Sequence, residues 1–368
     1  MSEKIRPGSP KANSRKVLLE PDSVPLSGRE VSLADTHDET EEDVVLNISL
    51  RPRAFTDFIG QPEVVGNLKV CLTAARERNE PLEHVLLSGP PGLGKTSLAH
   101  IIAHEMNGKI TATSGPAIEK AGDLIGILTN LENGDILFID EIHRLSKVVE
   151  EFLYPAMEDF QIDFVIDKGP YAKTIKFNLK PFTLVGATTR TGLLASPLRS
   201  RFGILYHLDF YKVEDLARIV SHSADVLGMK IDEEAAHEVA RRARGTPRIA
   251  NRLLRRIRDY AQVKKVDKIN LQIAANTLEE LGIDKAGLDD IDRKVLKVVL
   301  DTYSGGPVGV ESLAASLNEE VDTLTDTVEP YLLSAGYLKR TSRGRLATQK
   351  AFEHFGKKYN KENQEEMF

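Results

Sequence analysis

The segment HVLLSGPPGLGKTSLAHIIAHEM, His84 to Met106, joins an apolar run, a glycine-rich loop and a helical run. Its centre, Gly89 to Thr96, matches the pattern G-x-x-x-x-G-K-[S/T]. Glycines in this pattern let backbone N–H groups surround phosphates, and the start of the following helix favours an anion. Because the strand, loop and helix occur in this order, the segment predicts an α/β domain that binds a nucleotide.

The chemistry of this loop assigns roles to individual side chains. Lys95 is expected to reach the β- and γ-phosphates of ATP, and the Thr96 hydroxyl to bind Mg²⁺. The remaining expected phosphate contacts of the loop are Gly92, Gly94 and Ser97.

A second apolar run, Asp135 to Ile139, predicts a buried strand that ends in two acids. Ligands sit at the carboxyl ends of strands in open α/β sheets. Asp140 is therefore predicted to hold Mg²⁺ through water, and Glu141 to act as general base on the attacking water. The tetrapeptide that ends at His143 also resembles DExH helicases, but none of their other motifs is present.

A third strand is predicted for Phe182 to Ala187, beside the Asp140 strand. It ends in Thr188 and Thr189, where AAA+ proteins carry a polar residue called sensor 1 that orients the water. We favour Thr189 over Thr188, and the alternative is a threonine pair that only favours β structure.

Two arginine positions complete the resemblance to AAA+ proteins. Ser200-Arg201 resembles the Ser-Arg box that carries an arginine finger, usually supplied by a neighbouring subunit, with Arg199 as the alternative. Arg248 lies at the start of a predicted helix. In AAA+ proteins an arginine at this place, called sensor 2, contacts the γ-phosphate and couples the position of the lid to the nucleotide state, and Arg248 fits that role. A finger that acts between subunits implies a ring.

The composition indicates a soluble protein of several domains. The chain has 368 residues, 41% hydrophobic and 28% charged, and no apolar run long enough to cross a membrane. One cysteine excludes an internal disulfide, and no secretory signal is evident, so we expect a cytoplasmic protein. The net charge of −6 means that DNA binding requires local basic clusters.

The patterns divide the chain into five segments. The order of strands and helices indicates an α/β domain with a parallel sheet flanked by helices, then an all-helical domain and a winged-helix domain. The resemblance to AAA+ proteins implies that the first two are an AAA+ P-loop domain and its lid. The predicted bounds are 1–48 for a flexible N-terminal tail, 49–209 for the ATPase domain, 210–283 for the lid, 284–356 for the winged helix and 357–368 for a C-terminal tail.

Four further stretches resemble the RuvB family in order and spacing, over about Leu50 to Gly356: Arg51-Pro52 with Gly60 to Pro62, Thr113 to Pro116, Leu153 to Asp159, and Gly245 to Arg256. The resemblance implies a hexameric, ATP-driven ring that migrates Holliday junctions on double-stranded DNA in recombination and repair. The implied protein partners are RuvA and the resolvase RuvC. No association with a membrane is expected. It also implies adenine and ribose contacts from Leu50, Arg51, Glu158, Asp159, Phe160 and Tyr211.

The resemblance gives meaning to two more segments. Ile162 to Leu179 alternates apolar and polar residues, as a protruding hairpin does, and in RuvB such a hairpin docks on RuvA. The expected contacts are Phe164, Val165, Ile166, Tyr171 and Ile175, although a hairpin packed on the core explains the same pattern. The acid-free basic cluster at the predicted wing favours phosphate contacts from Lys339, Arg340, Arg343 and Arg345.

Two other functions share the nucleotide residues. The first is a clamp-loader-like or protein-remodelling AAA+ ATPase, which only the hairpin and the winged helix distinguish. The second is a DNA-binding module that a nucleotide gates without hydrolysis, which the intact Lys95, Asp140, Glu141 and Arg201 disfavour.

Overall fold

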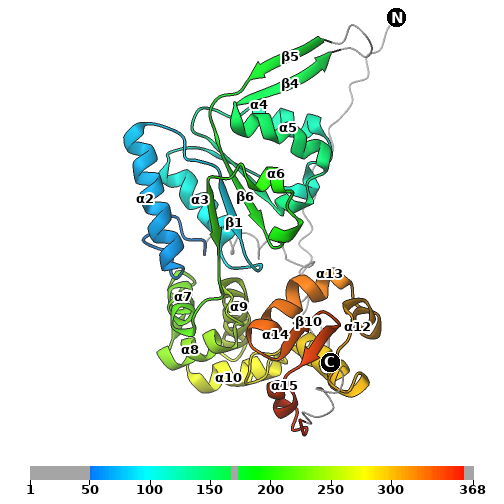
Figure 1. Cartoon of the computed structure of the whole chain (residues 1–368). Coiled ribbons are helices and arrows are strands. Elements are labelled where there is room, and N and C mark those ends of the chain that lie inside the picture. Colours follow the sequence, from blue (N-terminus) through cyan, green and yellow to red (C-terminus); the bar gives the residue numbers. More distant parts are fainter. Residues whose placement is uncertain (1–49, 167–172, 360–368) are drawn as a thin grey trace, which may run out of the picture. The chain divides into compact units, whose positions relative to one another are not determined.

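The computed structural model describes residues 50–166 and 173–359 (Figure 1). The predicted tail at 1–48 and most of the tail at 357–368 lie outside these ranges. No helix in the described ranges is long and apolar enough to cross a membrane.

A five-stranded parallel sheet forms the centre of the first domain, in the order β2-β3-β6-β1-β7. The three predicted strands are runs of buried residues and begin one residue later than expected, at Val85, Ile136 and Thr183, whereas the two edge strands were not predicted. The strands are β1 (Val85–Ser88), β2 (Ile110–Ser114), β3 (Ile136–Asp140), β6 (Thr183–Thr188) and β7 (Ile204–His207). The helices are α2 (Pro62–Arg78), α3 (Lys95–Glu105), α4 (Ala121–Thr129), α5 (Lys147–Glu158) and α6 (Ser196–Arg199).

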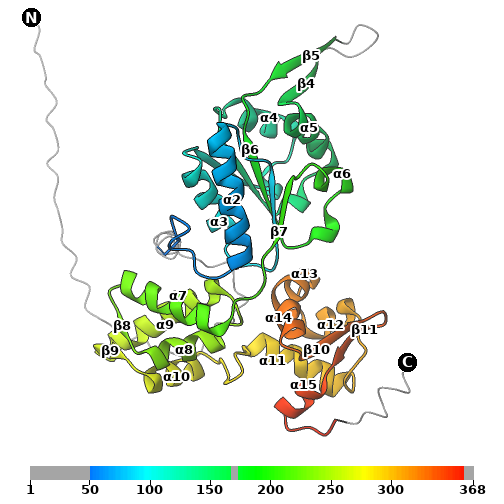
Figure 2. The same ribbon diagram turned by 60° about the vertical axis from the view of Figure 1, so that its left-hand side comes forward.

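Both faces of the sheet are covered, which explains why the central strands β1, β3 and β6 are buried along almost their whole length. Val85 and Leu87 of β1 pack in one hydrophobic cluster with α2 and α3, whereas Leu86 packs in a second cluster with α4 and α5. Figure 2 shows α2 and α3 against one side of the sheet. The layers place the carboxyl ends of β1, β3 and β6 at one edge, where the phosphate loop begins.

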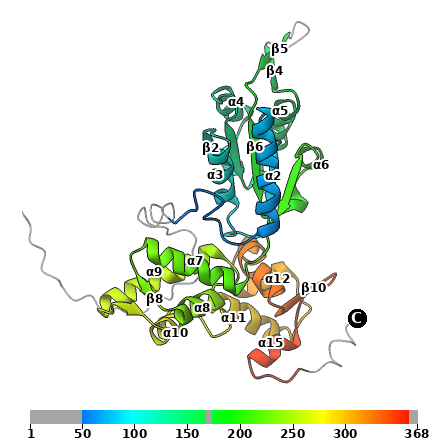
Figure 3. The same cartoon turned by 90° about the vertical axis from the view of Figure 1, so that its left-hand side faces the viewer.

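A hairpin leaves the sheet between α5 and β6. Its strands β4 (Gln161–Ile166) and β5 (Lys173–Asn178) are antiparallel and extend beyond α4 and α5 in Figures 1 and 3. This confirms the hairpin predicted for Ile162 to Leu179. The proposed RuvA contacts Phe164, Val165, Ile166, Tyr171 and Ile175 have side chains outside the described part of the chain.

The second domain is helical, as predicted, and contains α7 (Val213–Val226), α8 (Glu233–Arg242), α9 (Pro247–Val263) and α10 (Leu271–Glu280). The sequence did not predict its one pair of short strands, β8 (Lys230–Ile231) and β9 (Lys268–Ile269), since two residues give no measurable alternation. Its buried residues continue the cluster that begins under β1.

The third domain has its own core and the helix order of a winged helix. Its helices are α11 (Asp290–Lys297), extended by η4 (Val298–Thr302), then α12 (Val310–Leu317), α13 (Val321–Thr323), η5 (Leu324–Val328), α14 (Glu329–Ser334) and α15 (Gln349–His354). The wing is the antiparallel pair β10 (Leu338–Thr341) and β11 (Gly344–Ala347). Ser342 and Arg343 join these two strands.

Candidate nucleotide-binding and catalytic site

The phosphate loop has the left-handed backbone that its glycines permit. Gly89, Gly92 and Gly94 have φ angles of 133°, 78° and 101°. A Cβ at Gly89 would lie 2.4 Å from the carbonyl oxygen of Leu208, so a side chain there would displace the backbone. These glycines therefore set the path of the loop between β1 and α3.

Lys95 is held inside this loop. Its ammonium donates to the carbonyl oxygens of Gly89 at 2.7 Å and Pro90 at 2.9 Å. Burial lowers the pKa of Lys95, and the carboxylates of Asp140 and Glu141 oppose that shift. The ammonium thus occupies the loop at the position where a phosphate would meet it.

A cavity of about 480 Å³ opens in front of the loop, a size that suits a small ligand. Most of the predicted nucleotide contacts line it together: Leu50, Arg51, Gly92, Gly94, Lys95, Thr96, Ser97, Tyr211 and Arg248. The phenol of Tyr211 donates to the carbonyl of Leu93, and the backbone N–H of Arg248 donates to Gly92 at 3.4 Å. The lid is therefore joined directly to the phosphate loop.

Sequence reasoning missed part of the wall of this cavity. The additional lining residues are Pro52, Asp57, Phe58, Ile59, Pro91, Ile219, His222, Ser223, Pro247 and Asn251. Ile219 and His222 are one turn apart on α7 and share one face of that helix. This spacing was the only sign in the sequence that one face of α7 could line the cavity.

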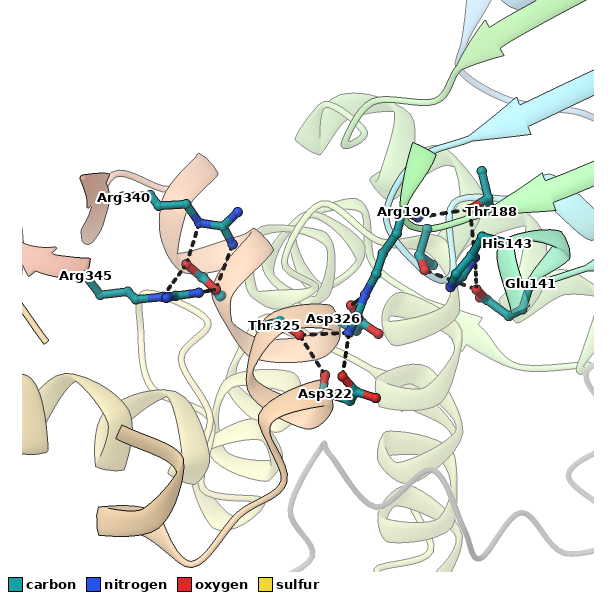
Figure 4. Close-up of polar contacts among 11 residues, drawn as sticks. Glu141, His143, Thr188, Arg190, Asp322, Thr325, Asp326, Arg340 and Arg345 are labelled. Carbon is teal, nitrogen blue, oxygen red and sulfur yellow. Dashed lines mark hydrogen bonds and ion pairs between the residues drawn. The ribbon is translucent and has the colours of Figure 1, made fainter. Parts of the chain in front are cut away.

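The tips of β3 and β6 bring the catalytic candidates together (Figure 4). The hydroxyl of Thr189 donates to Oε2 of Glu141 at 3.2 Å. Nδ1 of His143 lies 3.2 Å from the same oxygen and 2.9 Å from the hydroxyl of Thr188. Thr188 is fully buried, whereas Thr189 is partly exposed, so only Thr189 can also face a ligand.

His143 had been set aside with the DExH resemblance, and the structure gives it a different place. Burial lowers the pKa of its imidazole, while the neighbouring Glu141 opposes that shift. Both contacts are made by the same ring atom, Nδ1, which lies between the Glu141 carboxylate and the Thr188 hydroxyl. His143 thereby joins Glu141 to Thr188.

The backbone at Glu141 is unusual for a residue with a side chain. Its φ is 47°, in the left-handed region. A Cβ at Gly115 would lie only 2.4 Å from the carbonyl oxygen of Glu141. Strained residues of this kind gather at functional sites. The turn that presents the Glu141 carboxylate therefore depends on a glycine in a neighbouring loop.

The predicted metal ligands Thr96 and Asp140 line the same cavity. No group of three or more His, Cys, Asp or Glu side chains suited to a metal occurs within residues 50–166 and 173–359. Magnesium is commonly bound by one or two protein oxygens together with substrate phosphates, so this sparse set suits magnesium bound to a nucleotide.

Glu158, Asp159 and Phe160 do not line the cavity of their own chain. The Phe160 ring packs edge-on against Phe182, with centroids 5.8 Å apart, and lies 6.4 Å from His84. His84 stands directly before β1, whereas the phosphate loop follows β1. Phe160 therefore lies at the end of β1 that is opposite the phosphate loop. The expected adenine contact from these residues therefore does not form within one subunit.

The two arginines at the end of α6 and just after it differ in their surroundings. Arg199 is exposed, whereas Arg201 pairs with Glu158 at 3.1 Å and donates to the carbonyl of Pro197 at 2.6 Å. Neither lines the cavity of the same chain. Arg201 and Glu158 thus form a second cluster away from the phosphate loop.

The basic wing is only partly available to DNA. Lys339, Arg340 and Arg343 are exposed. Arg345 differs from the prediction, because its guanidinium donates two bonds to the buried carboxylate of Glu329, at 3.0 and 2.9 Å. Arg340, labelled in Figure 4, contacts the same carboxylate at 3.1 and 2.9 Å. Arg345 therefore holds the wing against α14.

Comparison with known proteins places this geometry in a family. Residues 50–208 match the model "Holliday junction DNA helicase RuvB P-loop domain", 211–284 the RuvB AAA lid domain and 285–356 the RuvB C-terminal winged helix domain. The branch migration complex subunit RuvB of Myxococcus xanthus is 56% identical over 322 residues, which cover 88% of this chain and 94% of the relative.

The chain belongs to the RuvB family.

Solved structures of RuvB agree. The Thermotoga maritima RuvB Holliday junction branch migration motor is 54% identical, with a TM-score of 0.79, and the match covers 85% of this chain and all of that one. A mutant of the same RuvB matches at the same identity and TM-score, over 84% of this chain. The predicted fold class is confirmed: an α/β AAA+ domain, a helical lid and a winged helix. RuvB proteins are AAA+ ATPases, so nucleotide binding and ATP hydrolysis are the chemistry of this family.

One further contact joins the catalytic candidates to the winged helix. Arg190 follows Thr189, and its backbone N–H donates to the hydroxyl of Thr188. Its guanidinium binds Asp326 at 2.5 Å, Asp322 at 3.0 Å and Thr325 at 2.9 Å (Figure 4). These contacts place His143, Thr188 and Arg190 between Glu141 and the winged helix.

Proposed function

We propose that this chain uses Glu141 as general base for hydrolysis of ATP. The observation that carries the proposal is the approach of Thr189 and Glu141 at 3.2 Å, at the edge of the cavity that also contains Lys95. In this scheme Lys95 binds the β- and γ-phosphates, Thr189 orients the carboxylate and water, and Arg248 contacts the γ-phosphate from the lid.

Magnesium completes the scheme when ATP is bound, by neutralising phosphate charge. Thr96 would hold it through its hydroxyl, and Asp140 through water. Both residues line the cavity, and both supply the oxygen ligands that magnesium prefers.

The arginine finger comes from a neighbouring subunit in this proposal. Arg201 lies outside the cavity of its own chain, as do Glu158, Asp159 and Phe160. A ring in which each subunit offers this surface to the next would supply every site with an arginine. We propose a hexamer, as the resemblance implies, with Arg201 as the finger and Glu158 to Phe160 near the neighbour's nucleotide.

The motor acts on DNA through the third domain. Exposed Arg340 and Arg343 would contact phosphates, with Arg345 as the support of the wing. Such contacts are independent of sequence, as movement along arbitrary DNA requires. We propose RuvA as the partner at the β4–β5 hairpin, Holliday junctions as the substrate, RuvC as a further partner and the cytoplasm as the location. The boundaries 49–209, 210–283 and 284–356 are part of this proposal.

The test is ATP turnover with and without a synthetic four-way junction and RuvA. We expect the junction and RuvA together to raise the rate of ATP hydrolysis. We also expect the labelled junction to be converted into its branch-migrated products. Unchanged turnover and an intact junction would reject the DNA role while leaving the ATPase assignment in place.

The same assay separates the alternative functions. A clamp-loader-like or remodelling ATPase would hydrolyse ATP without a response to junctions, and the three RuvB domain matches disfavour it. A nucleotide-gated DNA-binding module would bind ATP with no turnover, so Glu141→Gln would then change nothing.

A further inference from the structure

Tyr154 of α5 lies under the guanidinium of Arg201. The central guanidinium carbon is 4.4 Å from the centroid of the tyrosine ring. A guanidinium within about 6 Å of a tyrosine face is attracted to it by the ring quadrupole. The mechanism above gives Tyr154 no role, yet this residue touches the proposed finger.

The other contacts of Arg201 fix its orientation. Pro197 accepts a 2.6 Å hydrogen bond from one terminal nitrogen, and Glu158 pairs with the other at 3.1 Å. The Nε atom is buried and has no hydrogen-bond partner within the described ranges. The side chain of Arg201 is 21% exposed. The guanidinium is thus contacted on one face by Tyr154 and on two edges by Pro197 and Glu158, while part of the side chain remains exposed.

The spacing along α5 explains how the ring is placed. Glu150, Tyr154 and Glu158 are four residues apart and share one face of the helix. The phenol of Tyr154 donates to Oε2 of Glu150 at 3.2 Å, and Glu150 is only 5% exposed. Burial raises the pKa of Tyr154, so the phenol keeps its proton at neutral pH and continues to donate. Glu150 therefore anchors the far end of the ring that supports Arg201.

We propose that Tyr154 is a positioning residue for the arginine finger. Its ring keeps the guanidinium of Arg201 at the surface of one subunit, and Glu158 holds that guanidinium until the γ-phosphate in the neighbouring subunit replaces the carboxylate. This inference rests on the proposed function, in which Arg201 acts on the neighbour's ATP. A finger already oriented loses less side-chain freedom when it engages, so Tyr154 assists the chemical step and not nucleotide binding.

The test compares steady-state ATP hydrolysis by the full chain with two substitutions. Tyr154→Met keeps a long apolar side chain but removes the ring, and we expect kcat to fall about tenfold with KM nearly unchanged. Tyr154→Phe keeps the ring, so it should retain most of the wild-type kcat. A role confined to folding would lower thermal stability and active fraction without this difference between Met and Phe.

Tyr260 provides a matched control. It also lies on a helix beneath a cation, with the Lys264 ammonium 4.2 Å from its ring centroid, and it bonds to Glu280. Its hydrogen bonds within the described ranges join it to Lys264 and Glu280, which are outside the proposed site, so Tyr260→Met should leave kcat unchanged. Tyr154→Leu repeats the test with a smaller side chain if the methionine variant fails to assemble.

Arg201→Ala distinguishes the inference from the function on which it rests. We expect this variant to lose at least about a thousandfold in kcat, as loss of an arginine finger does. If Arg201→Ala has that effect but Tyr154→Met turns over at the wild-type rate, Tyr154 does not position the finger. If Arg201→Ala itself is fully active, the proposed finger is wrong and the role of Tyr154 falls with it.

Discussion

The Thr189 hydroxyl donates to Oε2 of Glu141 across 3.2 Å, from the tip of β6 to the tip of β3. These strands are hydrogen-bonded neighbours, with Ile139 paired to Gly186. Parallel pairing therefore brings together two residues separated by 48 positions in sequence. The contact fixes the orientation of the proposed base relative to the phosphate loop.

Removal of that hydroxyl should slow hydrolysis. A hydrogen bond to a charged group contributes about 1.5–3 kcal/mol, so Thr189→Val is expected to lower kcat by about 10- to 100-fold. ATP affinity should change little, because Lys95 and the loop are untouched. Thr189→Ser retains the hydroxyl and serves as control. Wild-type turnover by the valine variant would show that this contact does not matter for catalysis.

Gly115 should matter for activity although it lies outside the cavity lining. An alanine Cβ at this position would stand 2.4 Å from the carbonyl oxygen of Glu141, and two backbone segments would have to move. Because displacement of a catalytic group by about 1 Å can cost 100-fold, we expect Gly115→Ala to reduce kcat by about that factor. Gly122→Ala, where a Cβ meets nothing within 4 Å, is the control in the same ATPase measurement. Equal activity of the two variants would refute the steric argument.

Glu329 should give the winged helix a pH-dependent stability. Burial by itself raises the pKa of this carboxyl, but hydrogen bonds from Arg340 and Arg345 and their charges outweigh it, so the pKa is lowered overall. A lowered folded-state pKa means that the stabilisation is complete above the unfolded-state pKa and is lost as the pH falls through the folded-state pKa.

We therefore expect Glu329→Gln to destabilise the winged helix at pH 7 by about 3 kcal/mol, a low value for a buried ion pair because Arg340 is half exposed. Thermal unfolding from pH 7 down to pH 3 should show the wild type approaching the variant at the acid end. Glu311→Gln, at an exposed position on α12, is the control. A difference that stays constant over this range would contradict the role of the carboxylate charge.

The wing should bind DNA mainly by charge. Substitution of exposed Arg343 or Lys339 by alanine is expected to weaken binding equally for unrelated sequences, and each should reduce the slope of log K against log salt by about 1. Fluorescence anisotropy at several salt concentrations measures both effects. Lys109→Ala removes an exposed charge at the start of β2 and should change neither. Unaltered salt dependence in the wing variants would place the DNA contacts elsewhere.

The sequence predicted those parts of the site that are local. The phosphate loop, the acids after β3 and the threonines after β6 each follow a buried strand, and a parallel sheet brings such strand ends together. Partners that depend on distant packing escaped prediction. The edge-on contact of Phe160 with Phe182 and the pairing of Arg345 with Glu329 join segments 22 and 16 residues apart, and periodicity carries no signal for either.

His143 illustrates a different limit. Its motif suggested another class of helicase, and only its distance of 3.2 Å from Glu141 reveals a place in this site. The support of Arg201 by Tyr154 was equally hidden, because the spacing of Glu150, Tyr154 and Glu158 gains meaning only when α5 lies beside Arg201.

The central claim is that each catalytic site is completed by the next subunit, and mixing two inactive variants tests it most directly. Glu141→Gln has a defective site but offers an intact Arg201, whereas Arg201→Ala has an intact site but offers no finger. If Arg201 acts between subunits, ATP turnover in rings formed from an equal mixture should rise well above the sum of the separate variants. Turnover that never exceeds that sum, in rings shown to contain both variants, would contradict a site shared between subunits.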